Sequence, residues 1–478
     1  MPNEPTASSA IDGADILDLG IPEGPLVGDA LQAARACPAA EALLRVKQAW
    51  TDPNVVLNDP SLPEPLRSFA RSVKNERERR AYLDSLTALD EPQPYTVFGE
   101  DLVDAQTRAQ MDTAMRLPVA RKGALMPDAH VGYGLPVGGV LACDNAVIPY
   151  AVGVDIACRM MVSVFPKPWR AVKGETERLA NAIERETAFG AGSGFKQTPR
   201  QHDIMDDPRW DELPFVGRLH NKARHQLGSS GGGNHFVEWG TLTLHERVST
   251  HYGALAPGEY VALMSHSGSR GFGFQVCRHY KDIAQERCYG LPDDMRHLAW
   301  LALDEQSGQD YWHSMQLAGD YASANHHLIH RHVAKAAKLK PVWQVENHHN
   351  FCFREEHDGQ TLYVHRKGAT PADEGQLGII PGSMADRGVI VRGTGNDDAL
   401  RSCSHGAGRQ MSRTKAKQTL TRSDQKKYLA ARGVTLLSGG LDESPMAYKS
   451  IDDVLDAQSD LVDVIAAFQP KIVKMADD

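Results

Sequence analysis

The spacing of apolar and polar residues predicts an N-terminal helical extension. Apolar side chains recur at helical spacing over 25–51 and again over 63–89. The second helix has a dense charged face, which is typical of a solvated surface. Residues 1–24 are rich in Pro, Ala, Ser and Asp and predict a partly disordered lead-in. Nothing in residues 1–92 indicates chemistry.

The pattern changes at about residue 93, where glycine and β-forming residues become frequent. Short strand-like runs occur at 95–99, 235–240, 260–265, 340–345, 361–365 and 388–392. Helical spacing is found over 101–116, 174–188, 214–226, 274–334, 409–431 and 451–466. Strands and helices do not alternate regularly, so the predicted fold class is α+β. Residues 93–478 are predicted to form a single large core built on β-sheets with flanking helices.

Composition narrows the class of protein. The chain has 478 residues, of which 41% are hydrophobic and 24% charged, as in ordinary globular proteins. No apolar run is long enough for a membrane span, and the N-terminus lacks the features of a signal peptide. The seven cysteines are scattered, which predicts a reducing compartment and a cytoplasmic location.

Charge gives a mixed indication. The net charge of −9 does not favour nucleic-acid binding. Residues 401–432, however, hold nine Lys and Arg against one acidic residue. This stretch is a candidate RNA-backbone track, with a solvated helix face as the alternative.

Three β-like segments end in a histidine: His235, His266 and His349. Asp155 and Cys158 stand three residues apart in another segment rich in β-formers. Each residue alone is more typical of packing, but together they offer the mixed N, O and S ligands of a metal cluster. A structural zinc knot is disfavoured, because it would use more cysteines at close spacing.

Small residues surround the remaining candidates. Gly228–Gly233 precedes Asn234 and can wrap phosphates with backbone N–H groups, although a flexible linker is the alternative. The turns at 365–370 and 381–384 are further candidate nucleotide contacts. His405 lies among small residues at 402–408, followed by Arg409. It is a candidate covalent nucleophile that carries a nucleotide, the alternative being an ordinary turn.

With these residues assembled, the chain resembles the RtcB family of RNA ligases, the tRNA-splicing ligases. The segments in common are MPDAHVGYGLPVGGV, VGVDIACRM, GGGNHFVE, SHSGSRG, HHN, HRKGAT, IPGSM and HGAGR, in family order, from about residue 93 onward. The resemblance implies an RtcB-like fold and a GTP- and Mn²⁺-dependent RNA ligase. Such an enzyme joins RNA 3′-phosphate or 2′,3′-cyclic phosphate ends to 5′-hydroxyl ends, in RNA repair or tRNA splicing. It does so through a guanylylated histidine and an RNA-ppG intermediate.

The resemblance also implies roles for individual residues. His405 would be guanylylated, and Asp128 and Arg270 would act close to the reacting RNA ends. One Mn²⁺ would be held by Asp155, Cys158 and His235, and a second by Cys158, His266 and His349. The implied nucleotide-binding residues are Asn234, His235, Phe236, Val237, Glu238, His349, Asn350, Pro381, Gly382, Ser383, Met384, His405, Gly406, Ala407, Gly408 and Lys474. The implied partners are RNA and GTP, and an archease-like helper protein is a further candidate.

Two departures mark a divergent branch. The chain has PGSMADRG, so Gly388 stands where the family has a guanylate-contacting serine. It also has VDIACRM, which puts Arg159 next to the bridging cysteine. Two other functions stay open: a two-metal RNA phosphodiesterase or phosphatase, and a non-catalytic RNA-binding protein on the same scaffold. The first leaves HGAGR without a role, and the second does not need the complete set of ligands.

Overall fold

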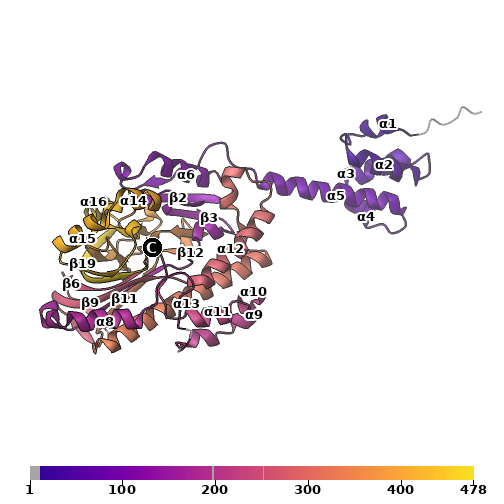
Figure 1. Cartoon of the computed structure of the whole chain (residues 1–478). Helices are drawn as coiled ribbons and strands as arrows, with labels where there is room; N and C mark the ends of the chain where they lie inside the picture. The colour runs from indigo at the N-terminus through magenta and orange to yellow at the C-terminus, as the bar shows by residue number, and fades with distance from the viewer. Residues whose placement is uncertain (1–10, 196, 198, 251, 478) are drawn as a thin grey trace, which may run out of the picture. The chain divides into compact units, whose positions relative to one another are not determined.

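The computed structural model describes residues 11–195, 197, 199–250 and 252–477. The chain divides into two compact units, Met1–Thr87 and Ala88–Asp478 (Figure 1). Within the described residues, no helix is both long enough and apolar enough to cross a membrane.

The N-terminal unit is helical. Its helices pack around a core that includes Val46, Leu66 and Phe69. Their bounds are α1 (Gly13–Leu17), α2 (Pro25–Arg35), α3 (Ala42–Thr51), α4 (Pro53–Leu57) and α5 (Glu64–Ser85).

Part of the predicted lead-in over 1–24 is helical. Residues 1–10 lie outside the described part, but α1 forms within 11–24. The Asp12 side chain caps this helix by accepting hydrogen bonds from the backbone N–H groups of Ala14 and Asp15. Ile16 is fully buried in the core of the unit, and this burial holds the short helix in place.

The larger unit is built on two main sheets. The five-stranded sheet has the order β1-β2-β3-β13-β12. Its strands are β1 (Thr96–Val97), β2 (Ala120–His130), β3 (Val137–Cys143), β12 (Asn350–His357) and β13 (Gln360–Lys367). The eight-stranded sheet has the order β11-β5-β9-β6-β19-β16-β15, with β18 beside β19. Its strands are β5 (Arg159–Phe165), β6 (Phe236–Leu244), β9 (Gly258–Ser267), β11 (Trp343–His348), β15 (Leu377–Ile380), β16 (Gly388–Gly393), β18 (Thr435–Ser438) and β19 (Val462–Met475). Small pairs join β4 (Ala146–Val147) to β10 (Leu301–Ala302), β7 (Val248–Thr250) to β8 (Gly253–Leu255), and β14 (Ala369–Pro371) to β17 (Ser402–Ser404).

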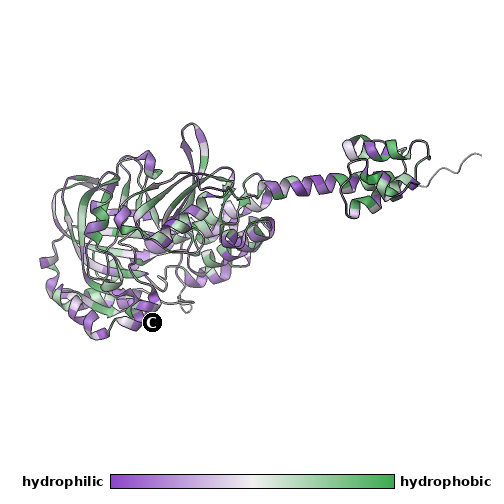
Figure 2. Cartoon of the chain, turned by 90° about the horizontal axis from the view of Figure 1, so that it is seen from above, coloured by the Kyte–Doolittle hydropathy of each residue, from purple (hydrophilic) through white to green (hydrophobic). Residues whose placement is uncertain are grey.

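Helices flank these sheets, which confirms the α+β prediction. The long helices α12 (Arg270–Arg287) and α13 (Gln306–Ala336) lie side by side (Figure 1). Ile329 and Val333 of α13 pack with Leu263 of β9 and Trp239 of β6. The strands are mainly hydrophobic and the outer helices have hydrophilic faces (Figure 2). The other helices are α6 (Ala105–Met115), α7 (Pro149–Val152), α8 (Thr176–Glu186), α9 (Arg209–Glu212), α10 (Pro214–Gly217), α11 (His220–Gln226), α14 (Arg413–Thr419), α15 (Arg422–Ala431) and α16 (Ile451–Asp456).

Two predicted helices were wrong in extent. The helix expected over 451–466 ends at Asp456, and β19 follows it. This strand pairs with β6 on one side and β16 on the other, so its apolar run is buried by the sheet. The helix expected over 409–431 is divided in two, because Thr421 caps α15 through the backbone N–H of Asp424.

Candidate active site

The ends of several strands bring the predicted metal ligands together. Cys158 immediately precedes β5, His235 immediately precedes β6, and His266 is near the end of β9. The Cys158 Sγ lies 3.4 Å from the Nε2 of His235 and 3.0 Å from the Nε2 of His266. Their three ligand atoms all lie within 4.8 Å of one another, so this buried group could hold a metal ion.

Asp155 and His349 extend the cluster on either side. The Asp155 Oδ2 is 2.9 Å from the His235 Nε2. The His349 Nε2 is 3.2 Å from the His266 Nε2. The five predicted ligands therefore form one continuous group of S, N and O donors. Such a mixed set suits a borderline divalent cation, so the residues present fit a metal.

Backbone carbonyls fix the orientation of two imidazoles. The Nδ1 of His235 lies 3.2 Å from the Ser230 oxygen, and that of His266 lies 3.0 Å from the Asn234 oxygen. If each Nδ1 carries the proton, each Nε2 presents a lone pair to the cluster. Burial lowers the pKa of His266 to about 3 and lowers that of His349 well below its usual value. Both rings are therefore neutral, the form that binds metals.

The thiol of Cys158 is protonated without a cation. Burial, together with the neighbouring Asp155 carboxylate, raises its pKa well above the usual value. A bound cation would reverse this balance, because a coordinating thiol is deprotonated.

His405 directly follows β17 and is held by a buried carboxylate. The Asp128 Oδ2 lies 2.6 Å from the His405 Nδ1 and accepts the His405 backbone N–H at 3.2 Å. Burial favours the neutral acid, but the His405 imidazole and the Lys449 ammonium hold the pKa of Asp128 below its usual value. An ionised Asp128 accepts a hydrogen bond from the Nδ1–H of His405, which leaves the Nε2 lone pair available as a nucleophile.

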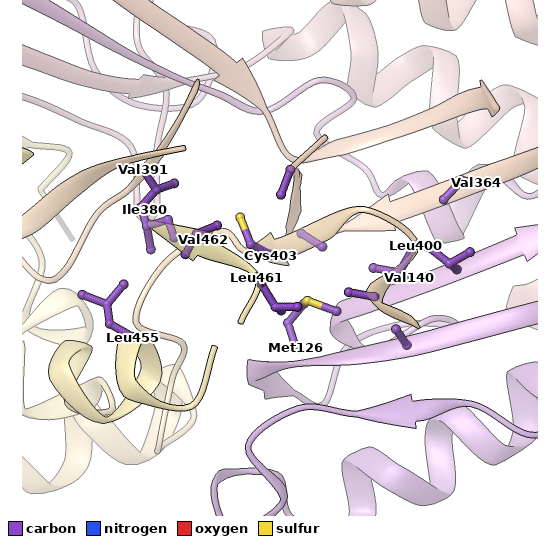
Figure 3. Packing of buried hydrophobic residues seen from close by; sticks show 14 of the residues in the cluster. Met126, Val140, Val364, Ile380, Val391, Leu400, Cys403, Leu455, Leu461 and Val462 are labelled. Atoms are coloured by element: carbon purple, nitrogen blue, oxygen red, sulfur yellow. The ribbon is translucent and has the colours of Figure 1, made fainter. Parts of the chain in front are cut away.

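Packing beneath His405 is tight. Cys403, Met126 and Leu461 lie together in one hydrophobic cluster (Figure 3), which also includes Ala407 of the turn. Gly408 has a φ of 72°, and a Cβ there would lie 2.2 Å from the backbone carbonyl oxygen of Asp128. Glycine at this position therefore lets the turn after His405 lie directly against β2.

The glycine-rich loop makes a similar close approach. A Cβ on Gly231 would lie 2.2 Å from the His235 Nδ1 and 2.6 Å from the Arg270 Nη1. Arg270 supports this loop from behind: its Nε donates to the Ser229 hydroxyl and its Nη2 to the Gly190 carbonyl, both at 2.9 Å. The structure thus places Arg270 in contact with the loop that positions His235.

One cavity of about 720 Å³ joins the metal ligands to His405. Most of the predicted nucleotide-binding residues line it: Asn234, His235, Phe236, Glu238, His349, Asn350, Pro381, Gly382, Ser383, Met384, His405, Gly406, Ala407 and Gly408. Glu238 is buried in its wall, and desolvation raises the pKa of its carboxyl well above the usual range. Burial therefore favours the protonated form of this carboxyl, which can both donate and accept a hydrogen bond.

Two predicted nucleotide residues are not brought to the cavity. Val237 is fully buried against Trp239 and Leu263 in the core of the sheet. Lys474 donates from Nζ to the Glu184 carbonyl at 3.3 Å. Its neighbours Val473 and Met475 line the cavity instead, because side chains alternate along β19.

The two departures from the family pattern have separate settings. Arg159 pairs with Glu346 at 3.2 Å and approaches the His348 Nδ1 at 3.5 Å. It therefore contacts residues outside the metal cluster. Gly388 lines the cavity, and a Cβ there would lie 3.2 Å from the Pro381 Cα. A larger residue would press on the predicted nucleotide turn.

Sequence reasoning missed Asp386, which also lines the cavity. It accepts hydrogen bonds from the Ser383 hydroxyl at 2.6 Å and the Tyr428 hydroxyl at 3.0 Å. No periodic pattern marks such a residue, because it lies in a turn between two strands.

The predicted turn at 365–370 has a different role. Arg366 is fully buried and pairs with Glu355, so its role is structural.

The basic stretch at 401–432 is partly neutralised by acidic side chains. Arg409 and Arg413 pair with Glu443, Lys417 lies 3.8 Å from Asp442, and Arg432 lies 3.3 Å from Asp386. These four of the nine cations therefore hold the C-terminal helices and turns together, which weakens the interpretation of the stretch as an RNA track.

The chain is similar to a known family of ligases. A family model described as tRNA-splicing ligase RtcB matches residues 110–475. The RNA-splicing ligase RtcB of Escherichia coli K12 is 35% identical over 390 residues, which cover 76% of this chain and 92% of that protein. The tRNA-splicing ligase RtcB of Thermococcus kodakarensis is 30% identical over 445 residues, covering 78% of this chain and 91% of that protein. The RNA-splicing ligase RtcB of Mycobacterium tuberculosis is 31% identical over 418 residues, covering 74% and 96%.

Proposed function

The chain belongs to the tRNA-splicing ligase RtcB family and is an RNA ligase, and from this premise we propose that it is GTP- and Mn²⁺-dependent. It joins RNA 3′-phosphate or 2′,3′-cyclic phosphate ends to 5′-hydroxyl ends, in RNA repair or tRNA splicing. The observation that supports this most directly is the Asp128–His405 pair, whose imidazole lines the same cavity as the Cys–His cluster.

His405 acts as the nucleophile. Its Nδ1 proton stays on the hydrogen bond to Asp128, and its Nε2 attacks the α-phosphorus of GTP. A P–N bond forms as the bond to the β-phosphate oxygen breaks, and pyrophosphate leaves. The ionised Asp128 offsets the positive charge that develops on the imidazole, as the acidic partner does in other carboxylate–histidine pairs.

The RNA ends then react in sequence. A 3′-phosphate oxygen attacks the guanylylated His405, breaking the P–N bond and forming RNA-ppG. The 5′-hydroxyl oxygen attacks the activated RNA phosphorus, and GMP leaves as the phosphodiester forms. A 2′,3′-cyclic phosphate must first be opened by water.

Two Mn²⁺ ions suit the cluster, one held by Asp155, Cys158 and His235, the other by Cys158, His266 and His349. When bound, such cations offset negative charge on phosphate oxygens. Arg270 donates a hydrogen bond to Ser229 of the glycine-rich loop that precedes His235, so its effect on catalysis is one of positioning. Glu238 is the proposed contact for the nucleobase, because its carboxyl group lines the cavity and can hydrogen-bond to a base edge.

We also propose a cytoplasmic location, because Cys158 must stay reduced to act as a shared ligand. An archease-like helper protein is a proposed partner for turnover.

A ligation assay tests this function. The full chain is incubated with one RNA ending in a 3′-phosphate and another beginning with a 5′-hydroxyl. We expect a joined product only when GTP and Mn²⁺ are both present, and none when the second RNA begins with a 5′-phosphate. Joining without GTP would contradict the proposal. RNA cleavage without joining would instead support a two-metal phosphodiesterase.

A further inference from the structure

One part of the cavity rim exposes apolar side chains that the proposed GTP site does not use. Tyr133 is 74% exposed, and Val131 and Val154 are 43% and 46% exposed. All three line the cavity that contains His405. Exposed apolar groups that gather at a binding cavity commonly mark a contact with a ligand.

Tyr133 comes from a different segment than the proposed nucleotide-binding residues. Tyr133 stands in the loop that connects β2 to β3 of the five-stranded sheet. The proposed GTP contacts at 234–238 and 381–384 lie at the start of β6 and in the turn between β15 and β16, in the eight-stranded sheet. Asn350 is a proposed contact from β12 of the five-stranded sheet, but Tyr133 is not among the proposed contacts. Bound GTP would therefore leave Tyr133 available for the second substrate.

The backbone around Tyr133 is held from two directions. The Gln110 Nε2 donates to the carbonyl oxygens of Gly132 at 2.6 Å and Gly134 at 2.8 Å, and its Oε1 accepts the Gly132 N–H at 3.0 Å. The Lys367 Nζ donates to the carbonyls of Tyr133 and Leu135. The loop backbone is thus fixed by polar contacts while the Tyr133 side chain stays exposed.

This loop is also linked to the nucleophile. Gly368 follows Lys367 in the chain, and a Cβ on it would lie 3.1 Å from the His405 Cε1. The same short segment therefore supports the Tyr133 loop and contacts the imidazole. A ligand on Tyr133 would be positioned relative to His405 through this segment.

The Tyr133 ring has a face free for stacking. Its centroid lies 6.2 Å from that of His297, and the two planes meet at 83°. The ring centroid of Tyr150, which also lines the cavity, lies 5.2 Å from that of His297. An edge contact covers at most one face of Tyr133, so a flat group can stack on the other.

We propose that Tyr133 is a stacking platform for the nucleobase at one of the two RNA ends that meet at His405. This inference rests on the proposed function. Single-stranded RNA ends present unstacked bases, which proteins hold on aromatic rings without strong sequence preference. Val131 and Val154 extend the apolar surface beside the ring.

The test measures RNA binding by fluorescence anisotropy, with Mn²⁺ and without GTP. Short RNAs that end in a 3′-phosphate or begin with a 5′-hydroxyl are compared, each with an intact or an abasic terminal nucleotide. We expect Tyr133→Ala to weaken binding of one of the two intact RNAs about 5- to 100-fold. Tyr133→Phe keeps wild-type binding, because it keeps the ring. Tyr252→Ala is the control, since Tyr252 is 63% exposed and lies away from this cavity, under Lys340.

The abasic RNAs separate stacking from a structural effect. The abasic end should weaken binding to the wild type but have no further effect on Tyr133→Ala. Equal loss in both proteins, wild-type binding of both RNAs by Tyr133→Ala, or equal loss in Tyr133→Phe would overturn the proposal. Formation of a protein–GMP adduct is measured in parallel and should be unchanged in Tyr133→Ala. An absent adduct in the wild type would instead count against the proposed function.

Discussion

The carboxylate of Asp128 determines which nitrogen of His405 is free to react. It accepts hydrogen bonds from both the Nδ1–H and the backbone N–H of that residue. In Asp128→Asn, the neutral amide can no longer offset charge on the imidazole. We expect the single-turnover rate of adduct formation with GTP to fall about 10²- to 10⁴-fold.

The matched control is Asp358→Asn, which removes an exposed carboxylate paired with Lys122. It should form the adduct at the wild-type rate. Equal rates in the two variants would show that Asp128 does not act on His405.

Metal binding should depend on pH through Cys158. Its pKa is raised, so its thiol must release a proton when a cation binds, whereas His266 and His349 are already neutral. Below the thiol pKa the proton competes with the metal, and affinity therefore rises with pH. We expect about a tenfold gain in Mn²⁺ affinity between about pH 6.5 and about pH 7.5.

Chelator competition at the two pH values measures this slope. Cys158→Ser should bind Mn²⁺ more weakly, and its affinity should no longer rise with pH through release of the thiol proton. A slope that is the same in the wild type and in Cys158→Ser would contradict the assignment of the thiol as a ligand.

At the scale of elements, the glycine-rich loop sets the position of a metal ligand. Gly231 has a φ of 142° and no room for a Cβ beside His235, whereas the nearest atom to a Cβ on Gly232 is 4.0 Å away. We expect Gly231→Ala to lower Mn²⁺ affinity about 10- to 100-fold, because it displaces the ring of His235. Gly232→Ala should bind Mn²⁺ as the wild type does, and equal losses in the two variants would refute the steric argument. Circular dichroism checks that both variants are folded.

Strand-end histidines could be recognised from sequence because an apolar run that stops at a polar ligand has a simple local pattern. His266 ends such a run, His349 follows one and His235 directly precedes one, and antiparallel pairing then brings them together. The α+β class followed from the same runs. Local pattern could also place Cys158 near a strand, but only the pairing of β5 with β9 places it beside His266.

Other features depended on contacts that are distant in sequence. The strand β19 has an apolar run that is buried on both sides by β6 and β16, and such runs cannot be distinguished from helix by periodicity alone. The predicted roles of Lys474 and Arg270 came from motif position, whereas side-chain direction was decided by the alternation along β19 and by the loop at Ser229. The ion pairs of Arg409 and Arg413 with Glu443 likewise could not be read from a charge count.

At the scale of the whole molecule, the N-terminal unit has its own hydrophobic core, formed only from residues of that unit. All the proposed ligands and His405 belong to Ala88–Asp478. We expect a chain of residues 88–478 to fold and to form the GTP adduct within about threefold of the full-length rate, as is usual for a separate domain. A well-folded truncated protein that loses more than about tenfold would show that the N-terminal unit contributes to catalysis.

The central claim is that His405 carries GMP covalently. The full chain is incubated with Mn²⁺ and GTP labelled at the α-phosphate, and the labelled protein is digested and sequenced by mass spectrometry. The account predicts one acid-labile, base-stable adduct on His405. It should be absent in His405→Ala and retained in the control His327→Ala, which changes an exposed histidine. A label on another residue, or no label on folded and metal-loaded protein, would contradict it.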